Sequence, residues 1–155
     1  MKVYLSADHR GVAAVTQLAD KLSRDGHEVR IDELCTTEPC DYPERAYEVA
    51  RAVASGEADR GVLVCGTGIG VAIAANKVRG VRAAVVHDEL TAELSRSHND
   101  ANVLCLSADL LGQRLIEKIA DVWFTTEFAG GRHARRVRKI EAIESGRNPA
   151  EVTDD

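Results

Sequence analysis

The sequence predicts an α/β fold, a three-layer sandwich in which helices cover both faces of a five-stranded parallel sheet. Five short apolar runs alternate along the chain with segments whose apolar residues recur at helical spacing. No Asn-Gly or Asp-Gly pair joins one of these runs directly to the next, as it would in a tight hairpin. The chain has 155 residues, of which 45% are hydrophobic, so it is long enough to bury one core. We therefore expect a single domain over residues 1–146.

The first half of the chain is expected to hold two strands and two helices. Apolar and β-branched residues indicate strands at 2–6 and 27–31. The segment 11–26 between them is typical of a helix, because its apolar residues recur on one face and a glycine ends the pattern. That face consists of Val12, Val15, Leu18, Ala19 and Leu22. A loop over 32–43 leads to a helix over 44–56, which has a proline near its start and a glycine at its end.

The second half of the chain continues the alternation. Its strands are expected at 61–65, 81–86 and 102–106. Its helices are expected to start near Ile69 and to cover 89–98, 108–128 and, as an extra C-terminal helix rich in basic residues, 133–146. Residues 147–155 have little to bury, so we expect a mobile tail.

The charge balance argues against two classes of partner. Lysine and arginine number 20 and acidic residues 25, which gives a net charge of −5, and both signs are interleaved along the chain. We therefore expect no nucleic-acid partner. No run approaches the ~18 apolar residues of a membrane span, so we expect no membrane partner either. The first residues form a strand pattern that leads into charged residues, unlike a signal peptide, which predicts a cytoplasmic protein.

Four cysteines are present, at Cys35, Cys40, Cys65 and Cys105. Without a secretory signal they are expected to be reduced thiols rather than a disulfide framework. Cys35 and Cys40 are close enough in sequence to pair or to bind a metal, but their spacing is not that of a zinc knuckle. We expect no metal site.

The stretch "CGTGIG" at 65–70 combines a thiol with a glycine-rich loop at the end of a predicted strand. In an open parallel sheet with the expected strand order 2-1-3-4-5, ligands bind where the first and third strands end. Those ends carry Asp8, His9 and Cys65. Three glycines would let backbone N–H groups turn toward a bound anion, at Gly66, Gly68 and Gly70. The loop therefore suits negative charge.

Two other interpretations of this loop stay open. The glycines could form only a tight turn, with Cys65 as a small buried hydrophobic residue. A dinucleotide site is the second alternative, because Asp88 stands near where a ribose-binding acid would be expected. The third glycine comes one residue too early for the G-x-G-x-x-G pattern, which weakens that alternative.

A second set of chemically active residues gathers in "SRSHNDANV" at 95–103 and "GGRHARRVRKI" at 130–140. A histidine at a helix end is often a cap, and arginines along a helix are usually solvated. Taken together they are harder to explain as structural residues. The set consists of His98, Asn99, Asp100, Arg132, His133, Arg135 and Arg136.

These motifs resemble the sugar-phosphate isomerases that include type B ribose-5-phosphate isomerase and the galactose-6-phosphate isomerase subunits. The resemblance covers nearly the whole domain. It rests on "SADHRG" at 6–11, "CGTGIG" at 65–70, "AANKV" at 74–78, "HDE" at 87–89, "SRSHNDANVL" at 95–104 and "GGRHARRV" at 130–137. It implies a Rossmann-like sheet, aldose–ketose isomerisation without a metal or cofactor, and a homodimer, or a dimer of such dimers, with active sites shared between subunits.

The resemblance also implies roles in proton transfer. Cys65 would be the base that moves a proton between C1 and C2, and amides with a nearby helix N-terminus favour its thiolate. Thr67 and Asn99 would hydrogen-bond the enediolate, and His98 would open the sugar ring. Backbone contacts to the substrate would come from Gly66, Gly68 and Gly70.

Substrate binding follows from the same resemblance. Asp8 would hold sugar hydroxyls, while His9, Arg132 and Arg136 would bind the phosphate, for which guanidinium groups are well shaped. His133 would be a weaker member of the phosphate group.

The sequence departs from the family pattern at three positions that bear on the substrate. Many members have Ser where this chain has Val71, and a small residue where it has Arg10. The family often has an arginine after the fifth strand, where this chain has Asp109. Ribose 5-phosphate and ribulose 5-phosphate are the expected pair. Alternatives are a four-carbon (erythrose or erythrulose phosphate) or six-carbon (allose or galactose phosphate) substrate and, more distantly, a binding module without turnover.

Overall fold

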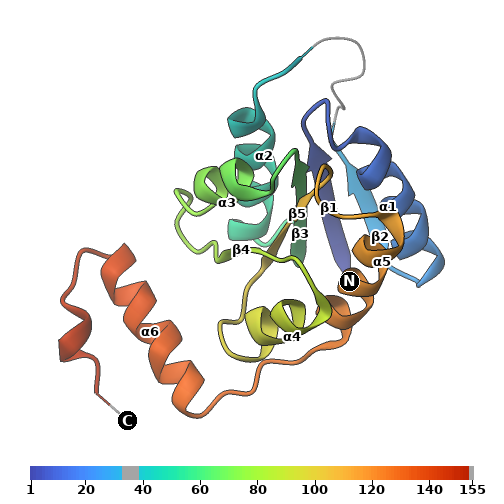
Figure 1. The fold of residues 1–155 in the computed structure, drawn as a ribbon. Coiled ribbons are helices and arrows are strands. Elements are labelled where there is room, and N and C mark those ends of the chain that lie inside the picture. Colours follow the sequence, from blue (N-terminus) through green and yellow to red (C-terminus); the bar gives the residue numbers. More distant parts are fainter. Residues whose placement is uncertain (33–38, 154–155) are drawn as a thin grey trace.

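The computed structural model describes residues 1–32 and 39–153, which form a three-layer α/β sandwich (Figure 1). Its sheet has five parallel strands, namely β1 (Lys2–Ala7), β2 (Glu28–Ile31), β3 (Arg60–Cys65), β4 (Ala83–Val85) and β5 (Val103–Ser107). The α-helices are α1 (Val12–Arg24), α2 (Tyr42–Ala54), α3 (Ile69–Ala75), α4 (Glu89–Ser97), α5 (Gln113–Thr125) and α6 (Arg132–Glu144). The predicted fold class is confirmed.

The order of the strands is β2-β1-β3-β5-β4, so the expected order 2-1-3-4-5 is wrong for the last two strands. Burial explains the difference. All residues of β5 are buried, whereas β4 has only three residues, each partly exposed. The fully buried strand therefore lies inside the sheet beside β3, and the short strand forms its edge. The neighbourhood of β1 and β3, on which the expected site depends, is unchanged.

Each face of the sheet carries its own core. On one face, α1, α4 and α5 pack over β1, β3 and β5, and Leu18, Ile119 and Trp123 are among the most deeply buried side chains. On the other face, α2 and α3 pack over the same strands through small residues such as Ala46, Ala50 and Ala75. Small side chains let those two helices approach the sheet and each other closely.

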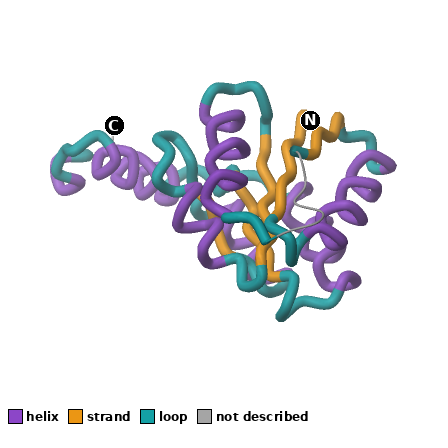
Figure 2. The backbone as a smooth tube through the Cα atoms, turned by 90° about the horizontal axis from the view of Figure 1, so that it is seen from above, coloured by secondary structure: helices purple, strands orange, loops and turns teal. Residues whose placement is uncertain are grey.

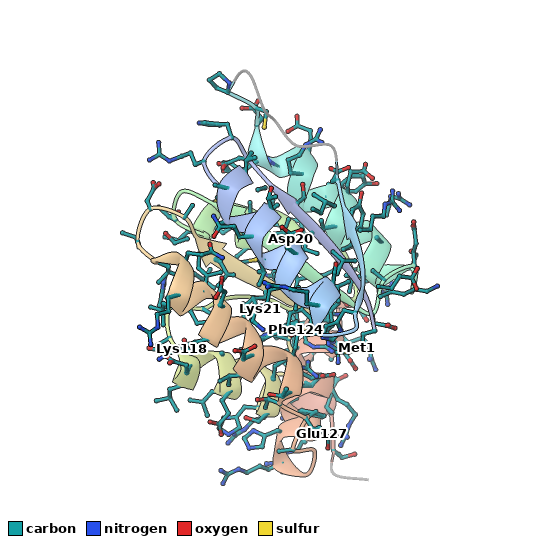
Figure 3. The ribbon with its side chains drawn as sticks, turned by 90° about the vertical axis from the view of Figure 1, so that its right-hand side faces the viewer. Met1, Asp20, Lys21, Lys118, Phe124 and Glu127 are labelled. Carbon is teal, nitrogen blue, oxygen red and sulfur yellow. The ribbon has the colours of Figure 1, made fainter. Side chains whose placement is uncertain are left out.

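Charged and aromatic side chains join α1 to α5. Figure 3 shows Lys21 and Phe124 where the two helices meet. Lys21 forms ion pairs with Asp25 at 2.6 Å and with Asp121 of α5. The ring of Phe124 lies 5.2 Å from that of His27, just after α1. These contacts lie far along the helices from the glycine loop.

Helix α6 stands apart from the three layers, beside the β4 edge (Figure 1), and projects from the molecule when it is viewed from above (Figure 2). Only part of its surface packs on the chain. Val137 and Ala142 are buried, whereas Ile140 and Ile143 are 43% and 61% exposed. An amphipathic helix with exposed isoleucines has an unpartnered apolar surface.

The residues after α6 include a one-turn 3-10 helix, Pro149–Glu151, which contacts α6. The side chain of Asn148 caps this turn by accepting a hydrogen bond from the N–H of Ala150 at 3.0 Å. The mobility expected for residues 147–155 stays a prediction.

The cysteines divide into two kinds. Cys65 and Cys105 are free and buried, as expected. Cys40 is disulfide-bonded, so the expectation of a reduced thiol is wrong at this position. That expectation rested on the cellular compartment, whereas a disulfide depends on whether a loop brings two sulfur atoms into bonding distance. Cys35 lies outside the described residues. In the described part of the chain, no helix has the length and apolarity to cross a membrane.

We predict that Gly11→Ala destabilises the fold. A Cβ at Gly11 would lie 2.7 Å from the carbonyl oxygen of Val64 and 2.9 Å from the Cβ of Ala7. Both neighbours belong to central strands that cannot move easily, so we expect a loss of about 1–3 kcal/mol in the free energy of unfolding. Urea denaturation measures this. Gly112→Ala is the control, because its Cβ would meet no atom within 4 Å. Equal denaturation midpoints for the two variants would contradict the prediction.

Candidate active site

The glycine loop after β3 wraps around the sulfur of Cys65. The N–H of Gly68 donates a hydrogen bond to this sulfur at 3.1 Å, and the residue is 4% exposed. Gly68 has a φ of 77°, and a Cβ there would lie 3.1 Å from the backbone of Leu106. Only glycine adopts this conformation at such a close approach without strain. The sequence therefore folds the loop so that an amide faces the thiol.

Strand β5 fixes the other side of the loop. The carbonyl of Gly66 accepts hydrogen bonds from the hydroxyl of Ser107 at 2.6 Å and from the N–H of Asp109 at 3.1 Å. The N–H of Ala108 donates to the carbonyl of Cys65 at 2.9 Å. The loop after β3 and the loop after β5 therefore form one rigid unit. Sequence analysis did not identify Ser107.

The remaining loop residues are more open. Thr67 is exposed, and its hydroxyl accepts a hydrogen bond from the N–H of Ile69 at 3.3 Å. At Gly70, a Cβ would lie 2.6 Å from the ring of Tyr42. Tyr42 begins α2 and thereby closes one wall of the loop, which the sequence did not predict.

Asp8 and His9 lie at the same edge of the sheet as Cys65, as expected. They follow Ala7, which pairs with Val64 in β3. Asp8 is only 6% exposed. One of its oxygens accepts from the N–H groups of Arg10 at 2.9 Å and Gly11 at 3.2 Å. This turn fixes the loop after β1, while the His9 side chain is exposed.

Arg10 and Asp109 form an ion pair across the glycine loop. The Nε of Arg10 lies 3.1 and 3.0 Å from the two carboxylate oxygens, and its Nη2 lies 2.8 Å from one of them. A Cβ on Gly66 would lie 2.9 Å from the Asp109 carboxylate, so the pair sits directly over this residue. Asp109 is not a helix cap, since Gly112 holds that position for α5. Arg10 and Asp109, the two positions where the sequence differs from the family pattern in charge, thus neutralise each other.

A second cluster joins the turn after α4 to the start of α6. The rings of His98 and His133 stack with centroids 4.0 Å apart and an interplanar angle of 8°. The Nε of Arg132 donates to the Nε2 of His133 at 3.4 Å. Burial and then the charges of His98, Arg132 and Arg136 lower the pKa of His133. The neutral imidazole is therefore favoured, with Nε2 free to accept the hydrogen bond.

The structure does not bring the two sets of predicted residues together within one chain. Cys65 pairs with Ser107 at the carboxyl end of the sheet, whereas His98 and Asn99 precede Val103 at its amino end. The five residues from Val103 to Ser107 alone span about 13 Å from the first Cα to the last. Arg132, His133 and Arg136 lie on the first turns of α6, and His133 joins them to the amino-end cluster through its stacking on His98.

The surroundings of Asp88 bear on the alternative of a dinucleotide site. Asp88 caps α4, because its side chain accepts from the N–H of Thr91 at 2.7 Å, and these hydrogen bonds lower the pKa of Asp88. A cap explains this acid without a bound ribose. Among the residues that the structure describes, no three acidic, histidine or cysteine side chains form a group suited to a metal ion.

Comparison with known proteins identifies close relatives. The sequence model of a family described as "Ribose/Galactose Isomerase" matches residues 3–140. Ribose-5-phosphate isomerase B of Escherichia coli (strain K12) is 44% identical over 147 residues, which cover 95% of this chain and 99% of that protein. D-erythrulose-4-phosphate isomerase of Pectobacterium atrosepticum is 46% identical over 99 residues, 64% of this chain and 65% of that protein.

A solved structure is equally similar. Ribose-5-phosphate isomerase B of Clostridium thermocellum superimposes with a TM-score of 0.92 at 47% identity. The match covers 94% of this chain and 99% of that one.

We predict that Arg10→Ala weakens the binding of inorganic phosphate about three- to tenfold, because it leaves the Asp109 carboxylate uncompensated beside the glycine loop. Adding Asp109→Ala should restore binding. Isothermal titration calorimetry measures both. Arg51→Ala is the control, since it removes another exposed arginine that pairs with a carboxylate, here Glu48. Equal weakening in the single and double variants would contradict the prediction.

Proposed function

Because the chain belongs to the ribose/galactose isomerase family, we propose that it interconverts ribose 5-phosphate and ribulose 5-phosphate through an enediolate, with Cys65 as the base. The observation that carries the proposal is the hydrogen bond from the Gly68 amide to the Cys65 sulfur. This N–H fixes the sulfur within the glycine loop. The sulfur lies at the strand end where an open parallel sheet binds its ligands.

Proton transfer between adjacent carbons suits a single base. Cys65 removes the proton from C2 of the open-chain aldose, and the C1 carbonyl oxygen takes up negative charge. The proton returns to C1 while the proton of the C2 hydroxyl passes to O1, so that a carbonyl forms at C2, a hydroxyl remains at C1, and the ketose is complete. The N–H of Gly68 contacts this sulfur, and Thr67, the preceding residue, is exposed. We assign the amides of the glycine loop and the hydroxyl of Thr67 as donors to the enediolate oxygens. The same loop thus serves both the base and the intermediate.

Ribose 5-phosphate is mainly a closed ring in water, so the ring must open before C2 can lose its proton. His98 suits this step as a partly exposed imidazole, and Asn99 beside it is exposed. Arg132 and Arg136 are exposed on the first turns of α6, where they suit the phosphate. His9 is assigned to the phosphate, and Asp8 is assigned to the sugar hydroxyls.

The separation of the two clusters supports a shared active site. One chain holds Cys65 at one end of the sheet and His98 at the other, so a complete site requires a second copy of the chain. The unpartnered surface of α6 supports the same arrangement. Between α6 and β4 lies an apolar groove, whose lining includes Val81, Ala83, Ala84, Ile140 and Ile143. We propose a homodimer in which α4 and α6 of each copy complete the partner's site.

A four-carbon substrate is the second candidate. The observation that favours it is the similarity to D-erythrulose-4-phosphate isomerase of Pectobacterium atrosepticum. The Arg10–Asp109 ion pair also favours a shorter substrate. Its two side chains lie over Gly66, where their charges cancel and their bulk narrows the space for the sugar.

A panel of phosphorylated sugars tests these proposals. The protein is incubated with four-, five- and six-carbon aldose and ketose phosphates, and isomerisation is followed by NMR. The highest kcat/KM is expected for ribose 5-phosphate. A higher value for erythrose 4-phosphate would support the four-carbon alternative. Binding without isomerisation, and without exchange of the C2 proton with solvent, would instead indicate a binding module.

We predict that Cys65→Ala lowers kcat about 10²–10⁴-fold, the contribution typical of a positioned base. The fold and phosphate affinity should change little, because a small side chain is removed. Steady-state kinetics and calorimetry measure the two effects. Cys105→Ala is the control, as this second buried thiol shares a core cluster with Cys65 and burial raises its pKa. A folded Cys65→Ala variant with nearly normal kcat would overturn the assignment.

We also predict that inactive variants complement each other. In a heterodimer of one Cys65→Ala and one Arg136→Ala chain, one site carries both changes and the other carries neither. Each heterodimer should therefore have about half of the activity of a wild-type dimer. Activity is measured after refolding an equal mixture of both chains, in which about half of the dimers are heterodimers, so about a quarter of the wild-type activity should return. If the mixture remains as inactive as its components, or an isolated monomer is fully active, the shared site is refuted.

A further inference from the structure

The turn that carries His98 and Asn99 has an unusual backbone. Asp100, the next residue, has a φ of 46° and is the only non-glycine residue with a positive φ in the described part of the chain. Its N–H donates to the carbonyl of Arg96 at 3.0 Å, and the next N–H, of Ala101, donates to that of Ser95 at 2.9 Å. The left-handed conformation is costly for most residues with a side chain, less so for Asp and Asn, and such conformations cluster at functional sites.

Two arginines hold the side chain of Asp100. One carboxylate oxygen accepts from Arg96 at 2.8 Å and the other accepts from Arg82 at 2.9 Å. The side chains of these arginines are only 5% and 19% exposed. Water therefore screens this arrangement much less than an ion pair at the surface.

The same two arginines also bind the backbone of the turn. The Nε of Arg82 donates to the carbonyls of Asn99 at 3.1 Å and Asp100 at 2.9 Å. Arg96 donates to the carbonyl of Ala101 at 2.6 Å. Three consecutive carbonyls of the turn thus accept hydrogen bonds from two guanidinium groups, whose charges Asp100 partly neutralises. The end of a helix can be formed by backbone hydrogen bonds alone, so these side-chain contacts are additional to what α4 needs in order to end here.

The cluster also sets the position of α6 relative to the turn. Arg82 lies 3.8 Å from Glu141 of α6, and Glu144 accepts from the N–H of Gly80 at 2.8 Å. At the other end of the helix, His133 stacks on His98. The turn and α6 are therefore joined at both ends of the helix, and a change at Asp100 reaches the imidazole of His98.

We propose that Asp100 is a positioning residue for ring opening: through Arg82 and Arg96 it holds the turn in the conformation that presents His98 to the sugar. The inference rests on the proposed function. In the step concerned, His98 takes the proton of the C1 hydroxyl, the C1–O4 bond breaks as the C1 carbonyl forms, and His98 delivers the same proton to O4. Asp100 touches neither the sugar nor its ring oxygen.

The chemistry of the substrates separates this role from a purely structural one. Ribose 5-phosphate closes its ring through O4. In erythrose 4-phosphate O4 carries the phosphate, so that sugar cannot form a five-membered ring and needs no ring opening. Misplacing His98 should therefore impair the five-carbon aldose selectively, whereas a general loss of structure would impair both.

The experiment compares kcat/KM for these two aldoses in Asp100→Asn and Arg82→Lys. Both changes are conservative, and using two keeps the test valid if one variant fails to fold. The ratio of ribose 5-phosphate to erythrose 4-phosphate should fall at least about tenfold, and His98→Gln should lower it in the same direction. Asp121→Asn is the control, because this aspartate is also held by a basic side chain, Lys21, but far from the turn. Circular dichroism checks that each variant is folded.

A second measurement follows ring opening without isomerisation. In a Cys65→Ala background, magnetisation transfer by NMR between the α and β anomers of ribose 5-phosphate reports catalysed opening and closing of the ring. Adding Asp100→Asn should slow this exchange at least about tenfold. A wild-type enzyme that exchanges anomers but does not isomerise would refute the proposed function and leave the role of Asp100 intact.

Three results would overturn the inference itself. The first is an equal fall in kcat/KM for both aldoses, and the second is an unchanged ratio in folded variants. The third is anomer exchange in the Cys65→Ala background that is absent or unaffected by Asp100→Asn.

Discussion

The parallel pairing of β3 with both β1 and β5 is the constraint on which the rest of the structure depends. It aligns Ala7 with Val64 and Cys65 with Ser107, so three loops emerge at one edge of the sheet. Two of these loops then bond directly, because the carbonyl of Gly66 accepts from the chain that follows β5. The thiol of Cys65 is thus held by the most deeply buried strands of the sheet, and the precision of the glycine loop comes from the core beneath it.

The same parallel order separates the two clusters, because each helix that follows a strand runs back toward the amino end of the sheet. The end of α4 and the start of α6 are therefore remote from Cys65, and no rearrangement of loops within one chain would unite them. The proposed homodimer would bring the two clusters of different copies together. It would also cover the isoleucines that α6 leaves exposed, so one association would account for both the apolar surface and the separation of the clusters.

Sequence patterns could predict the fold class and the motifs that carry Cys65 and His98, because periodicity and motifs are local properties, but they did not point to Ser107 or Tyr42. They could not rank β4 against β5, since strand order depends on which strand is more deeply buried. The pair of Arg10 and Asp109 joins loops 99 positions apart, and each residue alone looked like a departure from the family. The role of Asp100 was equally hidden, because a left-handed φ and two buried arginine partners leave no periodic signal in the sequence.

Both clusters hold their loops with ion pairs between arginine and aspartate, but these pairs differ in how far they are exposed to water. Arg10 and Asp109 have side chains that are 53% and 38% exposed, so their attraction is screened by water and the pair can open at little cost. Around Asp100 the arginines are largely buried, and opening that cluster would leave charges without water or partners. The wall beside Gly66 can therefore adapt to different sugars, while the turn that carries His98 stays fixed. Such a division suits a chain whose relatives include both a ribose-5-phosphate isomerase and a D-erythrulose-4-phosphate isomerase.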